Sequence, residues 1–451
     1  VQHNMQAANA NRMLGITSGA QAKSTEKLSS GYKINRAADD AAGLTISEKM
    51  RKQIRGLDKA SSNAQDGVSS VQTAEGALTE VHSMLQRMNE LAVQAANGTN
   101  SKDTDRKAIQ DEIDQLNTEI DRVAETTKFN EIYLLKGDDG EKTINLNAHD
   151  AGLKGTLVDN GSGKATFTMK ELSVGDSVSI GGKNYTIGST AADAQKIVTG
   201  QEKAGGKVTV NGVEYTYNDT DKKWKDAAGA DVQIGTGAAA GKIVIGDGDK
   251  VSDGTTTLTA MTDKKDATGA AKADGVDDND NSVISAEKAY SLAKDELVAA
   301  NHIGDTENTA AVAQDTTNKN VFTITTGSAK VANTLSFSLH VGADADMTNK
   351  ITVDIDTMNS ANLGIKGLNV TDKNGTAATY AIDAISDAIS KVSSQRSALG
   401  AVQNRLEHTI DNLDNISENT SSAESRIRDT DMAKEMVNYS KNNILAQAGQ
   451  S

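Results

Sequence analysis

The sequence predicts an α+β multidomain fold, in which both chain ends form one long antiparallel coiled-coil-like helical bundle around a mainly β central insertion. Three observations support this prediction. An apolar residue recurs at every seventh position near the N-terminus, a similar stripe recurs near the C-terminus, and the composition changes abruptly near residues 137 and 380. A seven-residue repeat keeps one face of a helix turned toward a partner helix. We therefore expect the two ends to pair and the segment between them to form an insertion.

The two apolar stripes define the expected packing seam. The first runs in sevens from Met50 to Ala92, and the second runs in sevens from Ile385 to Leu413. Both stripes are long enough to predict extended helices. The seam residues named by this pattern are Met50, Leu57, Val71, Leu78, Leu85, Ile385, Val392, Leu399, Leu406 and Leu413.

The N-terminal flank is expected to hold three helices. Gly31 suits the left-handed position that ends a helix, and the adjacent acids Asp39 and Asp40 favour the start of the next. That second helix should continue to about residue 96, where the turn-forming segment 97–100 stops it. A third helix should cover about residues 104–126.

The C-terminal flank is expected to return to helix. A helical pattern covers about residues 379–417 and is followed by a polar stretch at 418–423, where we predict a break. A last helix should follow, with Met432, Met436 and Leu445 among the apolar residues on one side.

The middle of the chain has the pattern of strands and turns. Arginine is missing between Arg122 and Arg396, and most of the glycines lie in this region. Alternating residues around Gly181-Gly182 and around Asn211-Gly212 predict two β-hairpins. Further strands are expected at 321–325, 334–341 and 350–355, with a loop at 342–349 and short helices at about 191–203 and 285–300, in one or two small domains.

Composition excludes several classes of protein. The 451 residues allow about two to four domains. The formal net charge of −15, with no basic block, disfavours binding to nucleic acid. No stretch approaches the roughly 20 apolar residues of a membrane span, and the first residues lack a signal-peptide core. We therefore expect no membrane insertion.

Cysteine and proline are both absent from the chain. A chain without cysteine has neither disulfides nor thiolate metal ligands. At average usage it would carry about twenty prolines, so their absence is a strong departure from ordinary composition. The absence of proline favours uninterrupted helices and lets the chain fold without slow prolyl isomerisation. This suits a protein that folds promptly after transport in an unfolded state.

No catalytic constellation is recognisable in the sequence. The six histidines show no metal-binding spacing, and the glycine-rich segment 235–242 fails as a phosphate loop because Ile243 replaces the required Ser or Thr. The acidic runs 247–253 and 274–280 match no known calcium loop and are expected to be solvated. We therefore expect no enzyme activity, no cofactor and no metal.

Several long motifs resemble the bacterial flagellins. At the N-terminal end the stretch LSSGYKINRAADDAAGL, residues 28–44, is similar to the flagellin signature, and the likeness continues through segments 54–57, 64–67, 72–78 and 85–94. At the C-terminal end the likeness is carried by SQRSALGAVQNRL, residues 394–406, and SRIRDTDMA, residues 425–433. The central residues carry no such likeness.

The resemblance implies a domain plan and a function. Residues 1–40 with 420–451 would form inner-tube helices, 41–136 with 335–419 the helical core that carries the seams, and 137–334 a variable, solvent-exposed and mainly β region. A flagellin is a structural subunit that polymerises into the extracellular flagellar filament for motility, and it is exported without a cleaved signal peptide. The implied partners are other copies of the same chain, an export chaperone and the filament cap.

The resemblance also implies recognition by a host Toll-like receptor ectodomain. The positions that match the receptor-binding residues of flagellins are Arg87, Leu91, Gln94 and Glu112. An exposed arginine with a leucine one turn further on is a reasonable pair for a binding hot spot. The same surface would also pack between subunits of a filament, and both uses stay open at this point.

Two alternative functions share the same terminal signatures. A hook-filament junction protein would carry them without building long filaments alone. An adhesin could use the central region, where Trp224 with Tyr215 and Tyr217 would form a stacking platform unless they are core residues, which we favour. Flagellins usually continue beyond the position that matches Ser451 and start before Val1, so we expect residues to be missing at both ends.

Overall fold

The computed structural model describes residues 5–235, 242–270, 272–372 and 374–450, and the candidate phosphate loop therefore lies almost wholly outside the described residues. The chain divides into two compact units. The first contains Val1–Gly76, Ser336–Ile355 and Gln395–Ser451, and the second contains Ala77–Leu335 and Asp356–Ser394. The three-part division expected from the family resemblance stays a prediction.

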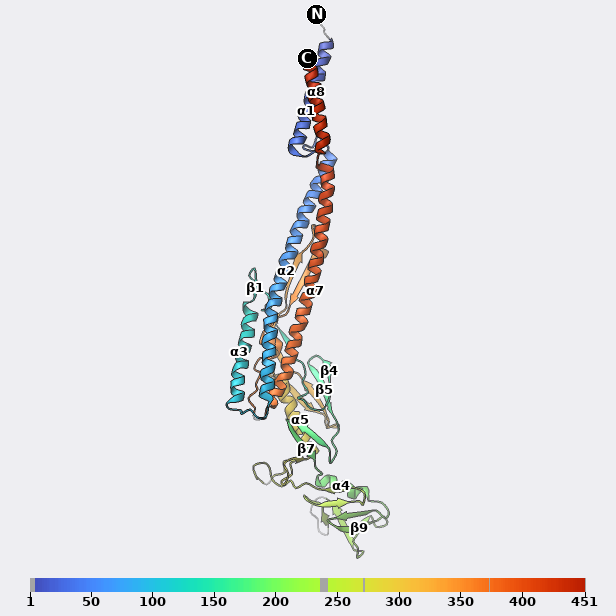
Figure 1. The fold of residues 1–451 in the computed structure, drawn as a ribbon. Coiled ribbons are helices and arrows are strands. Elements are labelled where there is room, and N and C mark those ends of the chain that lie inside the picture. Colours follow the sequence, from blue (N-terminus) through green and yellow to red (C-terminus); the bar gives the residue numbers. More distant parts are fainter. Residues whose placement is uncertain (1–4, 236–241, 271, 373, 451) are drawn as a thin grey trace. The chain divides into compact units, whose positions relative to one another are not determined.

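Five long helices come from the two flanks, and their presence beside a mainly β central region confirms the expected fold class (Figure 1). The first helix ends where expected, because Gly31 has φ +76° and its amide donates to the Lys27 carbonyl at 2.9 Å. The helices are α1 Met5–Ser30, α2 Ala41–Ala96, α3 Asp105–Thr126, α7 Thr376–Arg428 and α8 Met432–Gln450.

The predicted helix break at residues 418–423 is wrong. Helix α7 continues through this polar segment to Arg428, since neither glycine nor proline interrupts it. The break lies at residues 429–431 instead. There Asp431 caps the start of α8, and its carboxylate accepts from the Lys434 amide at 3.0 Å.

In the first unit, α2 and α7 pack antiparallel. The Ser61 hydroxyl of α2 donates to Asp414 of α7 at 2.9 Å. One turn earlier on α2, Asp58 accepts a hydrogen bond of 2.8 Å from Ser417, which lies one turn later on α7. Strands β19 Leu335–His340 and β20 Lys350–Ile355 form a two-stranded sheet. Side chains from both helices and from this sheet make one buried cluster of Ala64, Val341, Ile351 and Leu406.

Helix and sheet approach each other closely at Gly67. A Cβ atom added to Gly67 would lie 2.2 Å from Leu339 Cδ1 and 3.2 Å from Leu406 Cδ1. No larger residue fits without displacing one of these side chains. The glycine therefore lets β19 lie directly against α2.

The residues of the expected seam are buried with one exception. Met50, the first residue of the N-terminal stripe, is half-buried. Each of the others is no more than 5% exposed, namely Leu57, Val71, Leu78, Leu85, Ile385, Val392, Leu399, Leu406 and Leu413. The companion positions Ala64 and Ala92 are fully buried as well.

The second unit contains most of the strands. The hairpins around Gly181-Gly182 and Asn211-Gly212 are confirmed as β6–β7 and β8–β9. The elements are β1 Lys128–Phe129, β2 Ile132–Tyr133, β3 Asp138–Asn145, β4 Gly155–Gly161, β5 Lys164–Met169, β6 Ser177–Ile180, β7 Lys183–Ile187, α4 Ala191–Gly200, β8 Lys207–Val210, β9 Val213–Asn218, β10 Lys223–Lys225, β11 Asp231–Gly235, β12 Lys242–Val244, β13 Lys250–Ser252, β14 Thr257–Thr259, β15 Val283–Ile284, α5 Ala286–Asn301, β16 Ala311–Gln314, β17 Val321–Thr325, β18 Ser328–Asn333 and α6 Ser360–Leu363.

Most of these strands belong to two larger hydrophobic cores. In one, α5 packs with the sheet of order β16-β17-β5-β4 around Phe167, Phe322 and Leu297. In the other, α4 packs with the sheet of order β12-β11-β10-β9-β8-β13-β14. The chain enters and leaves the second core at adjacent points, because Ser189 pairs with Ala260 in a β-bridge. The second core is thus a module inserted into the first.

Asp305 organises the loop between α5 and β16. Its carboxylate is 0% exposed and accepts from the backbone amides of Ala310 at 2.8 Å and Ser328 at 3.0 Å. Burial acts to raise the pKa of Asp305, but these amide donors outweigh it and the pKa lies below its usual value. The ionised carboxylate therefore stabilises the folded state.

We expect Asp305→Asn to lower the free energy of unfolding by about 2 kcal/mol at neutral pH, since buried amide donors lose their charged acceptor. Because the pKa of Asp305 is lower in the folded state, its contribution to the free energy of unfolding is fully present above the unfolded pKa of about 3.9. This contribution is lost as the pH falls through the pKa of the folded state. Urea unfolding should show the difference between wild type and variant shrinking below about pH 4. The exposed Asp103→Asn is the control, and a difference independent of pH would contradict the assignment.

Candidate functional site

Apolar side chains line an exposed groove on α8, in the first unit. Met436, Val437, Ile444 and Leu445 are between 49% and 67% exposed. Their spacing places them on one side of the helix, with Ser440 and Lys441 between them. A continuous exposed apolar stripe of this kind marks an interaction surface.

Helix α1 lies beside α8 and is also apolar on the outside (Figure 1). Met5, Met13 and Ile16 are 77%, 53% and 59% exposed. The pair of terminal helices therefore carries exposed apolar residues on both of its members. Among the described residues these side chains remain largely in solvent, which is typical of an interaction surface.

The four residues that the resemblance assigns to receptor binding line one depression in the second unit. Arg87, Leu91 and Gln94 come from α2, and Glu112 comes from α3. The Arg87 side chain is half exposed, and its Nε donates to Glu112 Oε1 at 2.9 Å. A second ion pair joins Arg87 to Glu90 at 3.2 Å. The structure thus brings all four residues together.

Electrostatics fix the charge and the position of the Arg87 guanidinium. The hydrogen bond that Arg87 donates to Glu112, followed by the one that it donates to Glu90, raises the pKa of Arg87 above its usual value. Both partners are exposed, so solvent screens these pairs and they add little to stability. They place two carboxylates beside an exposed cation.

Leu91 occupies a different environment from its three companions. It is only 2% exposed, whereas Gln94 and Glu112 are exposed. A fully buried leucine offers a partner almost no surface in this conformation. The expected hot-spot pair of Arg87 and Leu91 therefore combines one exposed and one buried side chain, and its role in receptor binding stays a prediction.

Trp224, Tyr215 and Tyr217 of the central region are core residues. Trp224 is 3% exposed, and its ring lies 5.2 Å from the ring of Tyr217 in an edge-to-face arrangement. Tyr215 is 9% exposed and belongs to the same cluster. Rings that are buried against one another cannot stack on a sugar. The stacking platform considered for an adhesin is therefore not formed.

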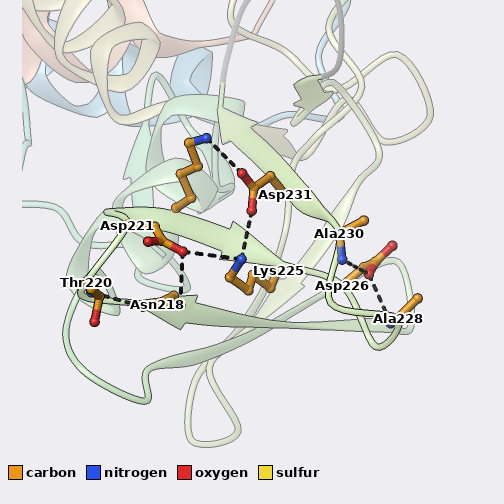
Figure 2. A network of polar contacts seen from close by, with 9 residues as sticks. Asn218, Thr220, Asp221, Lys225, Asp226, Ala228, Ala230 and Asp231 are labelled. Carbon is orange, nitrogen blue, oxygen red and sulfur yellow. Dashed lines mark hydrogen bonds and ion pairs between the residues drawn. The ribbon is translucent and has the colours of Figure 1, made fainter.

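Polar side chains on the surface of this module pair with one another. Figure 2 shows Lys225 of β10 and Asp231 of β11 joined across neighbouring strands, at 2.8 Å. Lys223 holds the other oxygen of the same carboxylate at 2.7 Å. The two lysines, Lys223 first, lower the pKa of Asp231 to about 2. The arrangement fixes the pairing of two short strands and offers no group poised for chemistry.

The described residues contain no group of His, Asp or Glu side chains that could hold a metal ion. In the acidic run at residues 274–280, the carboxylates of Asp274, Asp277 and Asp280 each accept the backbone amide of the residue two positions further on. Across the described ranges, no helix is long and apolar enough to cross a membrane.

Sequence inspection missed one buried charged residue. Arg106, at the start of α3, is 0% exposed and donates to the carbonyl oxygens of Ala95 at 2.8 Å, Asp372 at 3.0 Å and Asn97 at 3.1 Å. The cation thereby caps the last turn of α2 and ties it to the loop before α7. In the sequence, Arg106 follows an acidic residue at a helix start, and this position does not indicate that the side chain is buried.

Comparison with known proteins decides the family. Models of the bacterial flagellin N-terminal helical region and C-terminal helical region match residues 1–139 and 382–451. A flagellin of Clostridium tyrobutyricum is 37% identical over 455 residues, covering 100% of this chain and 97% of the relative. The chain belongs to the bacterial flagellin family. Flagellins are structural proteins of the flagellar filament, so the chain is a filament structural subunit.

Other relatives agree with this assignment. Flagellin C of Vibrio cholerae serotype O1 is 36% identical over 451 residues, covering 100% of this chain and 94% of the relative. A solved structure of FliC from Burkholderia pseudomallei is 18% identical and covers 75% of this chain and 99% of its own, but its TM-score of 0.29 is too low to support a structural argument. Membership of a structural family is consistent with the expected lack of enzyme activity.

Proposed function

We propose that this flagellin polymerises through the terminal helices α1 and α8 into the filament used for motility, after export in an unfolded state. The apolar stripe on α8 is the observation that carries the proposal, because Val437 and Ile444 remain about two-thirds exposed in the single chain. A contact between different surfaces of identical subunits generates a helical filament when its rotation does not close into a ring. Exposed apolar area on both α1 and α8 supplies such surfaces.

Export and capping partners follow from the same proposal. An export chaperone would shield the apolar stripe of α8 before assembly, and a filament cap would guide folding at the growing end. The absence of proline removes slow isomerisation from that folding step.

Polymerisation without any cap distinguishes the filament subunit from a hook-filament junction protein. We expect the purified full chain to form long filaments after addition of ammonium sulfate, since such salts strengthen apolar association. Electron microscopy of negatively stained samples gives the result directly. A chain that stays soluble alone, yet caps the ends of preformed filaments, would favour the junction protein instead.

We propose in addition that the depression around Arg87 contacts a host Toll-like receptor ectodomain in the monomeric protein. The half-exposed guanidinium, held by Glu112 and Glu90, supports this proposal because it presents a fixed cation with little ordering cost. Gln94 adds an exposed amide beside it. Leu91 would contribute indirectly, because its buried side chain helps to hold α2 in position.

Arg87→Ala is expected to weaken binding of the monomer to the receptor ectodomain about 30-fold, since a central arginine anchor is lost. Surface plasmon resonance with immobilised ectodomain measures the effect. Arg122→Ala is the matched control, because it removes another exposed arginine that pairs with a glutamate on the same helix pair. Equal losses in both variants would show that net charge, and not this depression, drives binding.

A further inference from the structure

The terminal helices carry most of the exposed methionines of the chain. Five of its eleven methionines are between 48% and 77% exposed. Met5 and Met13 belong to α1, and Met432 and Met436 belong to α8, whereas Met347 lies in the turn between β19 and β20. Since α1 and α8 pack along each other, four exposed thioethers lie on a single pair of helices.

Met436 is part of the apolar stripe on α8. It lines the same groove as Val437 and Ile444. Met432 lies one turn before it, at the four-residue spacing that puts both side chains on one side of the helix. Flexible thioether side chains adapt well to irregular apolar contacts. Both methionines would therefore pack against the same neighbouring subunit as the rest of the stripe.

The fold shields other methionines. Met88, Met169, Met261 and Met358 are no more than 7% exposed. A dissolved oxidant must reach the sulfur atom, so exposure decides which thioethers react first. The folded, free subunit therefore directs an oxidant to the terminal helices and to Met347.

Oxidation would change the chemistry of the contact surface. The thioether sulfur attacks one oxygen of hydrogen peroxide, an S–O bond forms, the O–O bond breaks, and a water molecule leaves. The sulfur loses the two electrons that the peroxide gains. The product, methionine sulfoxide, is polar and chiral. Its oxygen accepts hydrogen bonds, which an apolar contact does not supply.

We propose that Met13, Met432 and Met436 form an oxidation-sensitive site, at which a peroxide converts the thioethers to sulfoxides and thereby weakens polymerisation. This inference rests on the proposed polymerisation through α1 and α8. A subunit is vulnerable while it is free, because assembly buries the stripe. Enzymes that reduce methionine sulfoxide would restore the subunit, so the modification is reversible.

A competition between oxidised and unoxidised subunits tests the proposal without any substitution. The purified full chain is partly oxidised with hydrogen peroxide, and filaments formed in ammonium sulfate are separated from free subunits. Mass spectrometry of peptides measures the sulfoxide at each methionine in both fractions. We expect sulfoxide at Met432 and Met436 to be about tenfold depleted in the filaments, whereas sulfoxide at Met347 should be equal in both fractions.

A leucine variant tests the same residues directly. Met13→Leu with Met432→Leu and Met436→Leu keeps the apolar surface but removes the oxidisable sulfur. This variant should form filaments equally well before and after peroxide treatment, whereas treated wild type should need about ten times more protein. Met347→Leu is the matched control, and peroxide should inhibit it as strongly as wild type. Methionine sulfoxide reductases A and B should restore assembly of the treated wild type.

Three results would overturn the proposal. One is equal sulfoxide content at Met436 in filaments and free subunits, and another is peroxide inhibition of the triple leucine variant. Equal depletion of sulfoxide at Met347 would assign the effect to oxidation in general. Failure of the untreated chain to polymerise is a separate outcome, because it contradicts the proposed role of the terminal helices and with it the inference that rests on that role.

Discussion

Replacing Arg106 with alanine is expected to destabilise the second unit by about 4 kcal/mol, because three carbonyl oxygens lose a buried, charged donor at once. The guanidinium is fully enclosed, so water cannot simply take its place. The end of α2, the start of α3 and the loop before α7 would lose their common anchor.

Urea unfolding and amide exchange together measure this effect. Faster exchange should be confined first to the residues around Ala95 and to the start of α7. Arg106→Lys is the informative comparison, because a lysine keeps the charge but cannot reach three carbonyls in the plane of a guanidinium. We expect it to recover about half of the loss. A cost below about 1 kcal/mol for alanine would show that the carbonyls find other partners.

Leu406→Ala is expected to cost about 3 kcal/mol in the first unit. Leu406 is fully buried among Ala64, Val341 and Ile351, so truncation removes buried apolar contacts and leaves a cavity. Both the α2–α7 contact and the docking of the small sheet would weaken.

Ile416→Ala is the matched control for this seam variant. It truncates a large aliphatic residue on the same helix, but Ile416 is 37% exposed, and we expect a cost below about 1 kcal/mol. Unfolding in urea followed by circular dichroism compares the two. Similar costs for both variants would contradict the special role of the seam.

Helical periodicity in the sequence revealed the long helices because each flank repeats one simple pattern many times. The helix end at Gly31 was also predictable, since a glycine suited to the left-handed position marks it locally. The break after Arg428 was misplaced because a run of polar residues tolerates helix, whereas the real break depends on Asp431 and on pairing with a distant linker. Such pairing leaves no local trace.

Short strands and buried polar residues were harder to foresee. Strands β10 to β14 are three to five residues long, too short for alternation to be distinctive. The clustering of Arg87, Gln94 and Glu112 agrees with the positions carried over from the flagellin signature, but the burial of Leu91 depends on how α2 packs. The burial of Arg106 could not be predicted either, because it depends on tertiary contacts alone.

The most direct test of the account is whether the apolar stripe on α8 drives polymerisation. The account predicts that the full chain forms filaments in ammonium sulfate, whereas the double variant Val437→Ser with Ile444→Ser stays monomeric with unchanged helix content. A control variant, Lys434→Ser with Asn438→Ser, alters exposed polar residues of the same helix and should still polymerise. Normal filaments from the Val437→Ser and Ile444→Ser variant, seen by electron microscopy, would contradict the account.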